Sequence, residues 1–246
     1  MGFKYKTLCI AIAAMGFNNA YAEDADDKMF SFSGFGTIGA IQSSARNADF
    51  VADISAPTGV GSSTATSFNQ LSRLGMQVNG TFTEQWSGVV QAVSERSFDK
   101  SFTPKLTQAH LKYQFSPSLD VRLGRMPISL FMLTEFTRIG YAMPYAMPPA
   151  ETYGANMEVD GIDSTYKFNL GGVALSAHGY YGSLDYKIGV KGLQDPVTLK
   201  ITDSKGIHLT ADYGASTFIV GQISSQFTQK NPTIDGLYNL YRAAGF

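Results

Sequence analysis

The sequence predicts an all-β protein, and more specifically an antiparallel β-barrel that crosses a membrane with its strands. Two observations carry this prediction. In short segments, polar and apolar residues alternate with a period of two, so each strand has one polar and one apolar face. The connections between these segments alternate between short and long, as in transmembrane barrels, where short periplasmic turns face longer extracellular loops.

Residues 1–22 have the pattern of a secretory signal peptide. Lys4 and Lys6 form a positive start, residues 8–17 form an apolar core too short to span a bilayer, and Ala20-Tyr21-Ala22 provides a small-x-small cleavage site. We expect this leader to be removed, leaving residues 23–246 as one β-barrel domain.

Removal of the leader leaves 224 of the 246 residues, with 17 basic and 20 acidic side chains, a net charge of about −3. A charge so close to zero argues against nucleic acid as a partner. The only cysteine, Cys9, lies in the leader, so the exported part has no disulfide framework. A soluble secreted all-β protein and an outer-membrane barrel both fit this composition.

Nine segments fit β-strands. In residues 106–115, for example, Ala109, Leu111 and Tyr113 alternate with His110 and Lys112. The nine ranges are 29–42, 70–82, 86–98, 106–115, 119–124, 159–168, 173–181, 206–213 and 217–227. Residues 184–204 are mixed in pattern, and we expect a loop there, with room for a small hairpin.

The connections at 83–85, 116–118, 169–172 and 214–216 are short, whereas most of those at 43–69, 99–105, 126–158, 184–205 and 228–236 are longer. The connection at 126–158 is far longer than usual, and loops of that length in compact domains are commonly functional. It contains five aromatic residues, Phe131, Phe136, Tyr141, Tyr145 and Tyr153. We expect it to fold into the barrel mouth and narrow the pore; the alternative is a surface loop or lid.

Three stretches resemble Gram-negative outer-membrane general-diffusion porins. They are SRLGMQVNGTFTEQWSGVVQAV from Ser72, the Val121-Arg122-Leu123-Gly124-Arg125 strand before the long loop, and GIDSTYKFNLGGVALSAHGYYG from Gly161. The resemblance covers about residues 28–227. It implies a water-filled channel in the outer membrane for small hydrophilic solutes and ions, usually a homotrimer, with no cofactor, no metal and no catalytic residue.

In that family, acidic residues on the loop after the fifth strand lie opposite a basic cluster on the pore wall. Carried over by position, the implied constriction residues are the basic Arg73, Arg96, Arg122 and Arg125 and the acidic Glu135 and Glu151. Opposed charges across a narrow opening set up a field that sorts solutes by charge. The alternative is that these arginines only pair with Asp120, Glu95 or Asp163 on the wall.

Strand number is where the sequence departs from the family. Porins of 16 to 18 strands enclose an aqueous channel, whereas this sequence shows nine, or ten if residues 237–246 form a final strand. We therefore expect the N-terminal part of a barrel of about sixteen strands. A non-channel barrel, serving as adhesin or anchor, and a barrel enzyme are the alternative functions. The three histidines match no catalytic motif, so we expect no enzyme.

Overall fold

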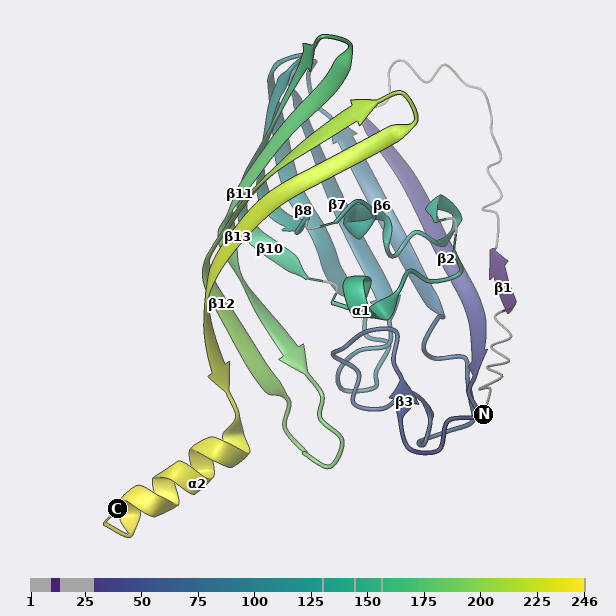
Figure 1. The fold of residues 1–246 in the computed structure, drawn as a ribbon, viewed down its shortest axis with the longest axis vertical. Coiled ribbons are helices and arrows are strands. Elements are labelled where there is room, and N and C mark those ends of the chain that lie inside the picture. Colours follow the sequence, from purple (N-terminus) through teal and green to yellow (C-terminus); the bar gives the residue numbers. More distant parts are fainter. Residues whose placement is uncertain (1–9, 14–28, 130, 144, 156, 246) are drawn as a thin grey trace.

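A computed structural model describes residues 10–13, 29–129, 131–143, 145–155 and 157–245. Most of the predicted signal peptide and the expected cleavage site at Ala22 lie outside these residues. The described chain is all-β, built around one large antiparallel sheet (Figure 1).

Nine long strands form the body of this sheet, each paired with the next along the chain. They are β2 (Phe30–Gln42), β6 (Arg73–Thr81), β7 (Trp86–Glu95), β8 (Lys105–Ser116), β9 (Leu119–Pro127), β10 (Glu158–Leu170), β11 (Val173–Ile188), β12 (Val197–Tyr213) and β13 (Ser216–Lys230). Each of the nine overlaps a predicted segment, because alternation with a period of two is a local signal of strand structure.

Four short strands complete the β structure of the described residues. β1 (Ile10–Ala13), inside the predicted signal peptide, pairs with residues 37–40 of β2, and β5 (Thr66–Ser67) pairs with the end of β2. β3 (Asp49–Phe50) and β4 (Val60–Gly61) form a separate hairpin in the 43–72 connection. Short turns gather at one end of the sheet and long connections at the other (Figure 1), as the sequence predicts.

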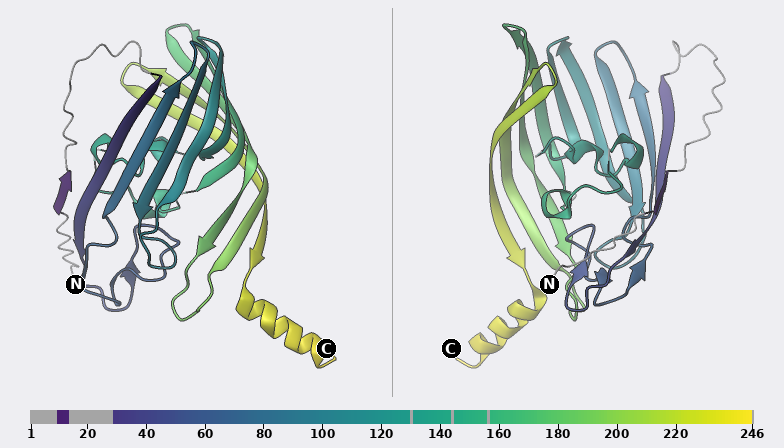
Figure 2. Two further views of the ribbon diagram at one scale, coloured as in Figure 1. Left: turned by 180° about the vertical axis from the view of Figure 1, so that it is seen from behind. Right: turned by 45° about the vertical axis from the view of Figure 1, so that its right-hand side comes forward.

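The sheet curves strongly but is not closed into a barrel. In the described part of the chain, β2 and β13 are the two outer long strands, and they do not pair with each other. The concave side encloses the long connection after β9, which lies within the curve in both views of Figure 2.

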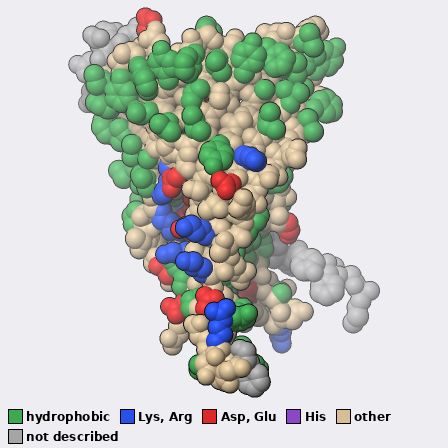
Figure 3. All heavy atoms as spheres, turned by 90° about the vertical axis from the view of Figure 1, so that its left-hand side faces the viewer, with side chains coloured by type: hydrophobic (Ala, Val, Ile, Leu, Met, Phe, Trp, Pro, Cys, Tyr) green, Lys and Arg blue, Asp and Glu red, His purple; other side chains and the backbone are tan. Residues whose placement is uncertain are grey.

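The convex face of the sheet is apolar. Cross-strand register places Leu111 beside Leu123, Leu123 beside Ile162, and Ile162 beside Tyr181. All four side chains are exposed. Figure 3 shows the hydrophobic side chains gathered nearer the end with the short turns, with charged side chains beyond them.

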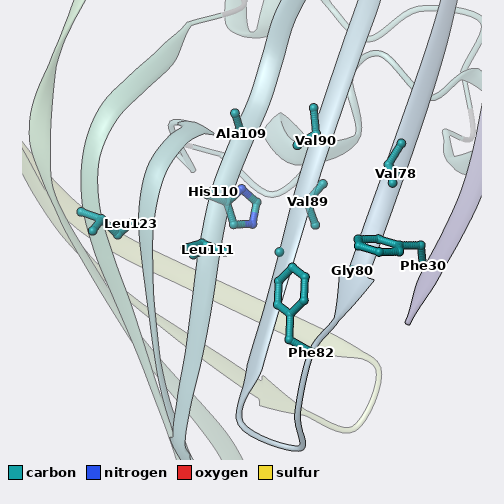
Figure 4. A pocket seen from close by; sticks show the side chains of 11 residues that line it. Phe30, Val78, Gly80, Phe82, Val89, Val90, Ala109, His110, Leu111 and Leu123 are labelled. Atoms are coloured by element: carbon teal, nitrogen blue, oxygen red, sulfur yellow. The ribbon is translucent and has the colours of Figure 1, made fainter. Parts of the chain in front are cut away.

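A depression of about 290 Å³ interrupts this apolar face between β6 and β9 (Figure 4). Its width reflects two glycines, since a Cβ at Gly80 would press on the ring of Phe82 and one at Gly88 on the side chain of Leu111. Phe82 also meets Phe30 edge to face, with ring centroids 6.1 Å apart. The aromatic side chains therefore pack over backbone that lacks side chains of its own.

Two predicted segments differ in the structure. Residues 184–204 are not mainly loop, because β11 continues to Ile188 and β12 begins at Val197. An irregularity in the pairing of β11 with β12 after Gly182 explains the mixed pattern, since an extra residue in β12 breaks the alternation there.

Residues 237–245 do not form a tenth strand; position 246, the end of that suggested strand, lies outside the described residues. The helix α2 (Pro232–Ala243) occupies this region, and Asn231 caps it by accepting hydrogen bonds from the amides of Thr233 and Ile234. A capping Asn followed by Pro at the first helical position is a helix start signal. No helix within the described ranges is both long and apolar enough to cross a membrane.

Candidate functional site

The candidate site is the connection between β9 and β10, which we call the inner loop (residues 128–157). Its described part contains two 3-10 turns, η2 (Thr134–Phe136) and η3 (Gly140–Ala142), and one helical turn, α1 (Ala150–Tyr153). Side chains of the sheet hold it at two points, which we call the first and the second clamp.

The first clamp joins the inner loop to β9 and β10 through Arg122. The guanidinium donates from Nε and Nη2 to the Asp163 carboxylate, with an Nη2–Oδ2 distance of 2.6 Å, and from Nη2 to Glu135 Oε1 at 3.3 Å. Asp163 is only 3% exposed. Two further contacts fix the carboxylates: His178 Nε2 lies 3.2 Å from Asp163, and the Ser129 hydroxyl donates to Glu135 at 2.9 Å.

The second clamp reverses the charges, because here the arginine belongs to the loop. Arg138 Nε donates to Glu95 Oε1 on β7 at 2.8 Å, and its Nη1 lies 2.5 Å from a carboxylate oxygen of Glu158 at the start of β10. Burial alone would lower the pKa of Arg138, but the two carboxylates outweigh burial and raise it. Arg138 is therefore a permanent cation enclosed by the wall.

The inner loop also reaches the far edge of the sheet. Arg73 Nη1 on β6 donates to the carbonyl of Thr137 at 2.9 Å. Gly140 passes so close to Thr37 of β2 that a Cβ would lie 2.5 Å from the threonine hydroxyl. Met147 packs against a buried cluster of Ile41, Val60 and Leu71. The loop thus spans the concave side from β10 to β2.

Of the six predicted constriction residues, three contact one another or the loop. Arg122 and Glu135 form a pair, and Arg73 binds the loop backbone. The geometry differs from the expected one, since Glu135 touches the arginine instead of facing it across an opening. Arg122 also pairs with Asp163, so the wall-pairing alternative describes part of the arrangement.

The other three residues lie elsewhere. Arg96 donates to the hydroxyl of Thr58 at 3.0 Å, in the 43–72 connection. Arg125 pairs with Asp160, with side chains 40% and 52% exposed. Glu151 lies in the first turn of α1, exposed, and forms no ion pair within the described residues. Sequence reasoning did not assign Arg138, Glu95 or Glu158 to the site, although Glu95 was considered as a wall partner.

A second long connection, 43–72, crosses the end of the sheet where the long connections gather. Asp49 organises it by accepting hydrogen bonds from Ser62, Ser63 and the amide of Gly59. Loss of water raises the pKa of Asp49, but these hydrogen bonds together hold it well below its usual range. The connection then contacts the opposite wall, where the Tyr186 hydroxyl of β11 donates to Asp53 at 2.7 Å.

The three histidines lie on the concave face, His178 and His208 on the neighbouring strands β11 and β12, and His110 on β8. The rings of His178 and His208 are 4.7 Å apart, and His178 supports the first clamp through Asp163. The described residues contain no group of three or more His, Cys, Asp or Glu side chains arranged to hold a metal ion.

Comparison with known proteins gives no family: no family model matches the chain, and no curated protein matches it significantly.

Proposed function

We propose that the protein is an outer-membrane porin, a β-barrel channel for passive diffusion of small hydrophilic solutes and ions. In this proposal residues 1–22 direct export and are removed, the convex face contacts outer-membrane lipid, and the protein assembles as a homotrimer. No cofactor and no catalytic step belong to the proposal.

The two faces of the sheet support it. A barrel wall in a bilayer needs an apolar outer band and a polar inner surface, and the convex row of Leu123 and Ile162 adjoins the concave row of Arg122 and Asp163. The strands have 9 to 17 residues, enough for tilted strands to cross the hydrocarbon core, which takes about 9–11.

The observation that carries the proposal is the inner loop, clamped by buried ion pairs to inward-facing side chains. A loop fixed in this way narrows the space enclosed by the sheet. Because the ion pairs hold the loop in place, it does not move across that space and close it. In this proposal the charged groups of these contacts lie at the narrowest level of the pore, where their field acts on passing ions.

A sealed pore also requires partners for the outer strands, because unpaired backbone groups are not tolerated in lipid. In the antiparallel series, β2 and β13 are the first and ninth long strands, so they run in the same direction. Bacterial single-chain barrels have even strand numbers. We therefore propose that an odd number of further strands completes the wall between β13 and β2. Removal of the leader, which contains β1, would make the part of β2 that pairs with β1 available to such a strand.

Ion selectivity in planar bilayers tests the channel and the first clamp together. The Arg122→Ala change leaves the carboxylates of Asp163 and Glu135 without their shared cation, so we expect the reversal potential to shift toward cation selectivity. Arg125→Ala, on the same strand but the convex face, is the matched control and should leave it unchanged.

Two results would contradict the proposal. A preparation with a folded, heat-modifiable gel band but no conductance steps would exclude the channel. Conductance steps with the same reversal potential in the wild type and the Arg122→Ala variant would exclude the first clamp from the ion path.

A further inference from the structure

An apolar recess lies between the inner loop and the concave side of β11–β13. It has a volume of about 430 Å³. The loop contributes Phe131, Met132 and Tyr153, and the sheet contributes Tyr180, Ile219 and Ile223. Phe131 and Tyr153 meet edge to face with ring centroids 5.7 Å apart, so the loop wall of the recess is a paired aromatic surface.

The isoleucines of β13 depart from the pattern of the concave face. Register places Ile219 beside Thr210 and Ile223 beside Gly206, on the same face as His208. Both isoleucines are exposed, at 40% and 49%. The interior of a water-filled barrel is polar, so apolar side chains here create a surface that water covers poorly.

Two glycines form the floor of the recess. A Cβ at Gly206 would collide with the ring of Tyr180, and a Cβ at Gly221 would lie 2.7 Å from Cβ of His208. Because neither position has room for a side chain beside these neighbours, the floor stays flat and open between the aromatic ring and the isoleucines.

One edge of the recess is polar. His208 lines it, with its ring 4.7 Å from that of His178, and Ser129, which also lines it, donates from its hydroxyl to Glu135 of the first clamp. Small-molecule sites are typically of 300–1,000 Å³, mainly apolar and aromatic, with a few polar groups that fix orientation. This recess has all of these properties.

We infer that the recess is a binding subsite for small neutral solutes that carry an apolar ring at one end and hydroxyl groups at the other. The ring would lie on the glycine floor between the isoleucines and the Phe131–Tyr153 pair, with the hydroxyl groups at the His208 edge. The inference rests on the proposed function, because it assigns a solute class to the enclosed space of that channel.

Protection of an introduced cysteine tests the subsite. The chain without its leader has no cysteine, so the Ile223→Cys variant carries a single thiol in the recess, and Met132→Cys reports from the loop side. The rate of modification by a charged, water-soluble thiosulfonate is measured with phenyl β-glucoside or with methyl β-glucoside, which share a sugar and differ only in the ring. Asn79→Cys, on β6, is the control outside the recess.

We expect phenyl β-glucoside at millimolar concentration to slow modification several-fold at both recess positions, and methyl β-glucoside to leave the rates unchanged. Asn79→Cys should react at the same rate throughout. The Ile219→Thr change, added to Met132→Cys, should reduce the protection because it removes part of the apolar wall.

Equal rates with the two glucosides would overturn the inference. So would an Ile223→Cys thiol that never reacts, since another segment, such as a strand paired with β13, would then fill the recess. Modification does not depend on ion flow. Conductance without protection therefore refutes the subsite alone, and protection without conductance refutes the channel alone.

Discussion

Arg122 and Arg125 lie three residues apart on β9, yet they belong to two different environments. Arg122 is on the concave face, largely buried, and is shared by Asp163 and Glu135. Arg125 pairs with Asp160 at the same 2.6 Å, but both side chains are well exposed. The two ion pairs have the same length but should contribute differently to stability. Breaking the buried pair leaves a charge without water or partner, whereas water replaces the lost partner in an exposed pair.

The same contrast extends across the sheet. Rows of apolar side chains cover the convex face, and neighbouring rows of charged and polar side chains cover the concave face that holds the inner loop. Substitutions in these environments should therefore destabilise the protein to different extents.

The largest effect is expected at the second clamp. Arg138→Met removes the cation that pairs directly with the carboxylates of Glu95 and Glu158, and loss of one partner from a buried pair costs about 3–5 kcal/mol. We expect a lower free energy of unfolding in urea and faster chymotryptic cleavage in the inner loop.

Arg138→Lys is the control for charge, and it should recover part of the stability because it keeps a cation while losing the two-sided geometry of the guanidinium. An Arg138→Met variant as stable as the wild type, with an uncleaved loop, would show that the clamp does not hold the loop.

A charge placed on the convex face should have the next largest effect. Ile162 is 45% exposed there, and if it faces lipid, Ile162→Lys should destabilise the inserted protein by about 2–4 kcal/mol. Thr165→Lys, on the same strand but the concave face, should be tolerated. Folding into lipid vesicles measures both, and equal effects would contradict the assignment of the two faces.

The smallest effect is expected at the exposed pair. Arg125→Met should change the free energy of unfolding by less than about 1 kcal/mol, since exposed ion pairs contribute little, and it should leave cleavage of the inner loop unaltered. A loss as large as that of Arg138→Met would mean that this part of the convex face is covered in the protein.

The strands and their faces were predictable from the sequence because they follow from local alternation. In β10, for example, the adjacent apolar Ile162 and charged Asp163 indicate opposite faces of the strand, and this can be read without reference to any other strand. The Arg122–Glu135 contact was predicted only through family resemblance, and even then as charges facing each other across an opening.

The remaining features depend on contacts between residues that are far apart in the sequence. Arg138 is one charge among several in the loop sequence, and only folding encloses it between Glu95 and Glu158, which are 63 residues apart in the chain. The lengths of β11 and β12 were underestimated because an irregular pairing disturbs the alternation. Helix α2 was not predicted, and residues 237–246 were left open as a final strand, because Leu237 and Tyr241 fit a strand face as well as a helix face.

The most direct test of the central claim is a cysteine scan along β10 in outer membranes of cells that produce the protein, since the only cysteine of the sequence, Cys9, lies in the predicted leader. Each residue from 160 to 168 is replaced in turn by cysteine, and the reaction of that cysteine with a water-soluble and with a lipid-soluble thiol reagent is measured. We expect a period of two, with position 162 reactive toward the lipid-soluble reagent and positions 165 and 167, which are less buried than position 163, reactive toward the water-soluble one. Equal reactivity of both faces toward the water-soluble reagent would contradict a wall between lipid and an aqueous channel.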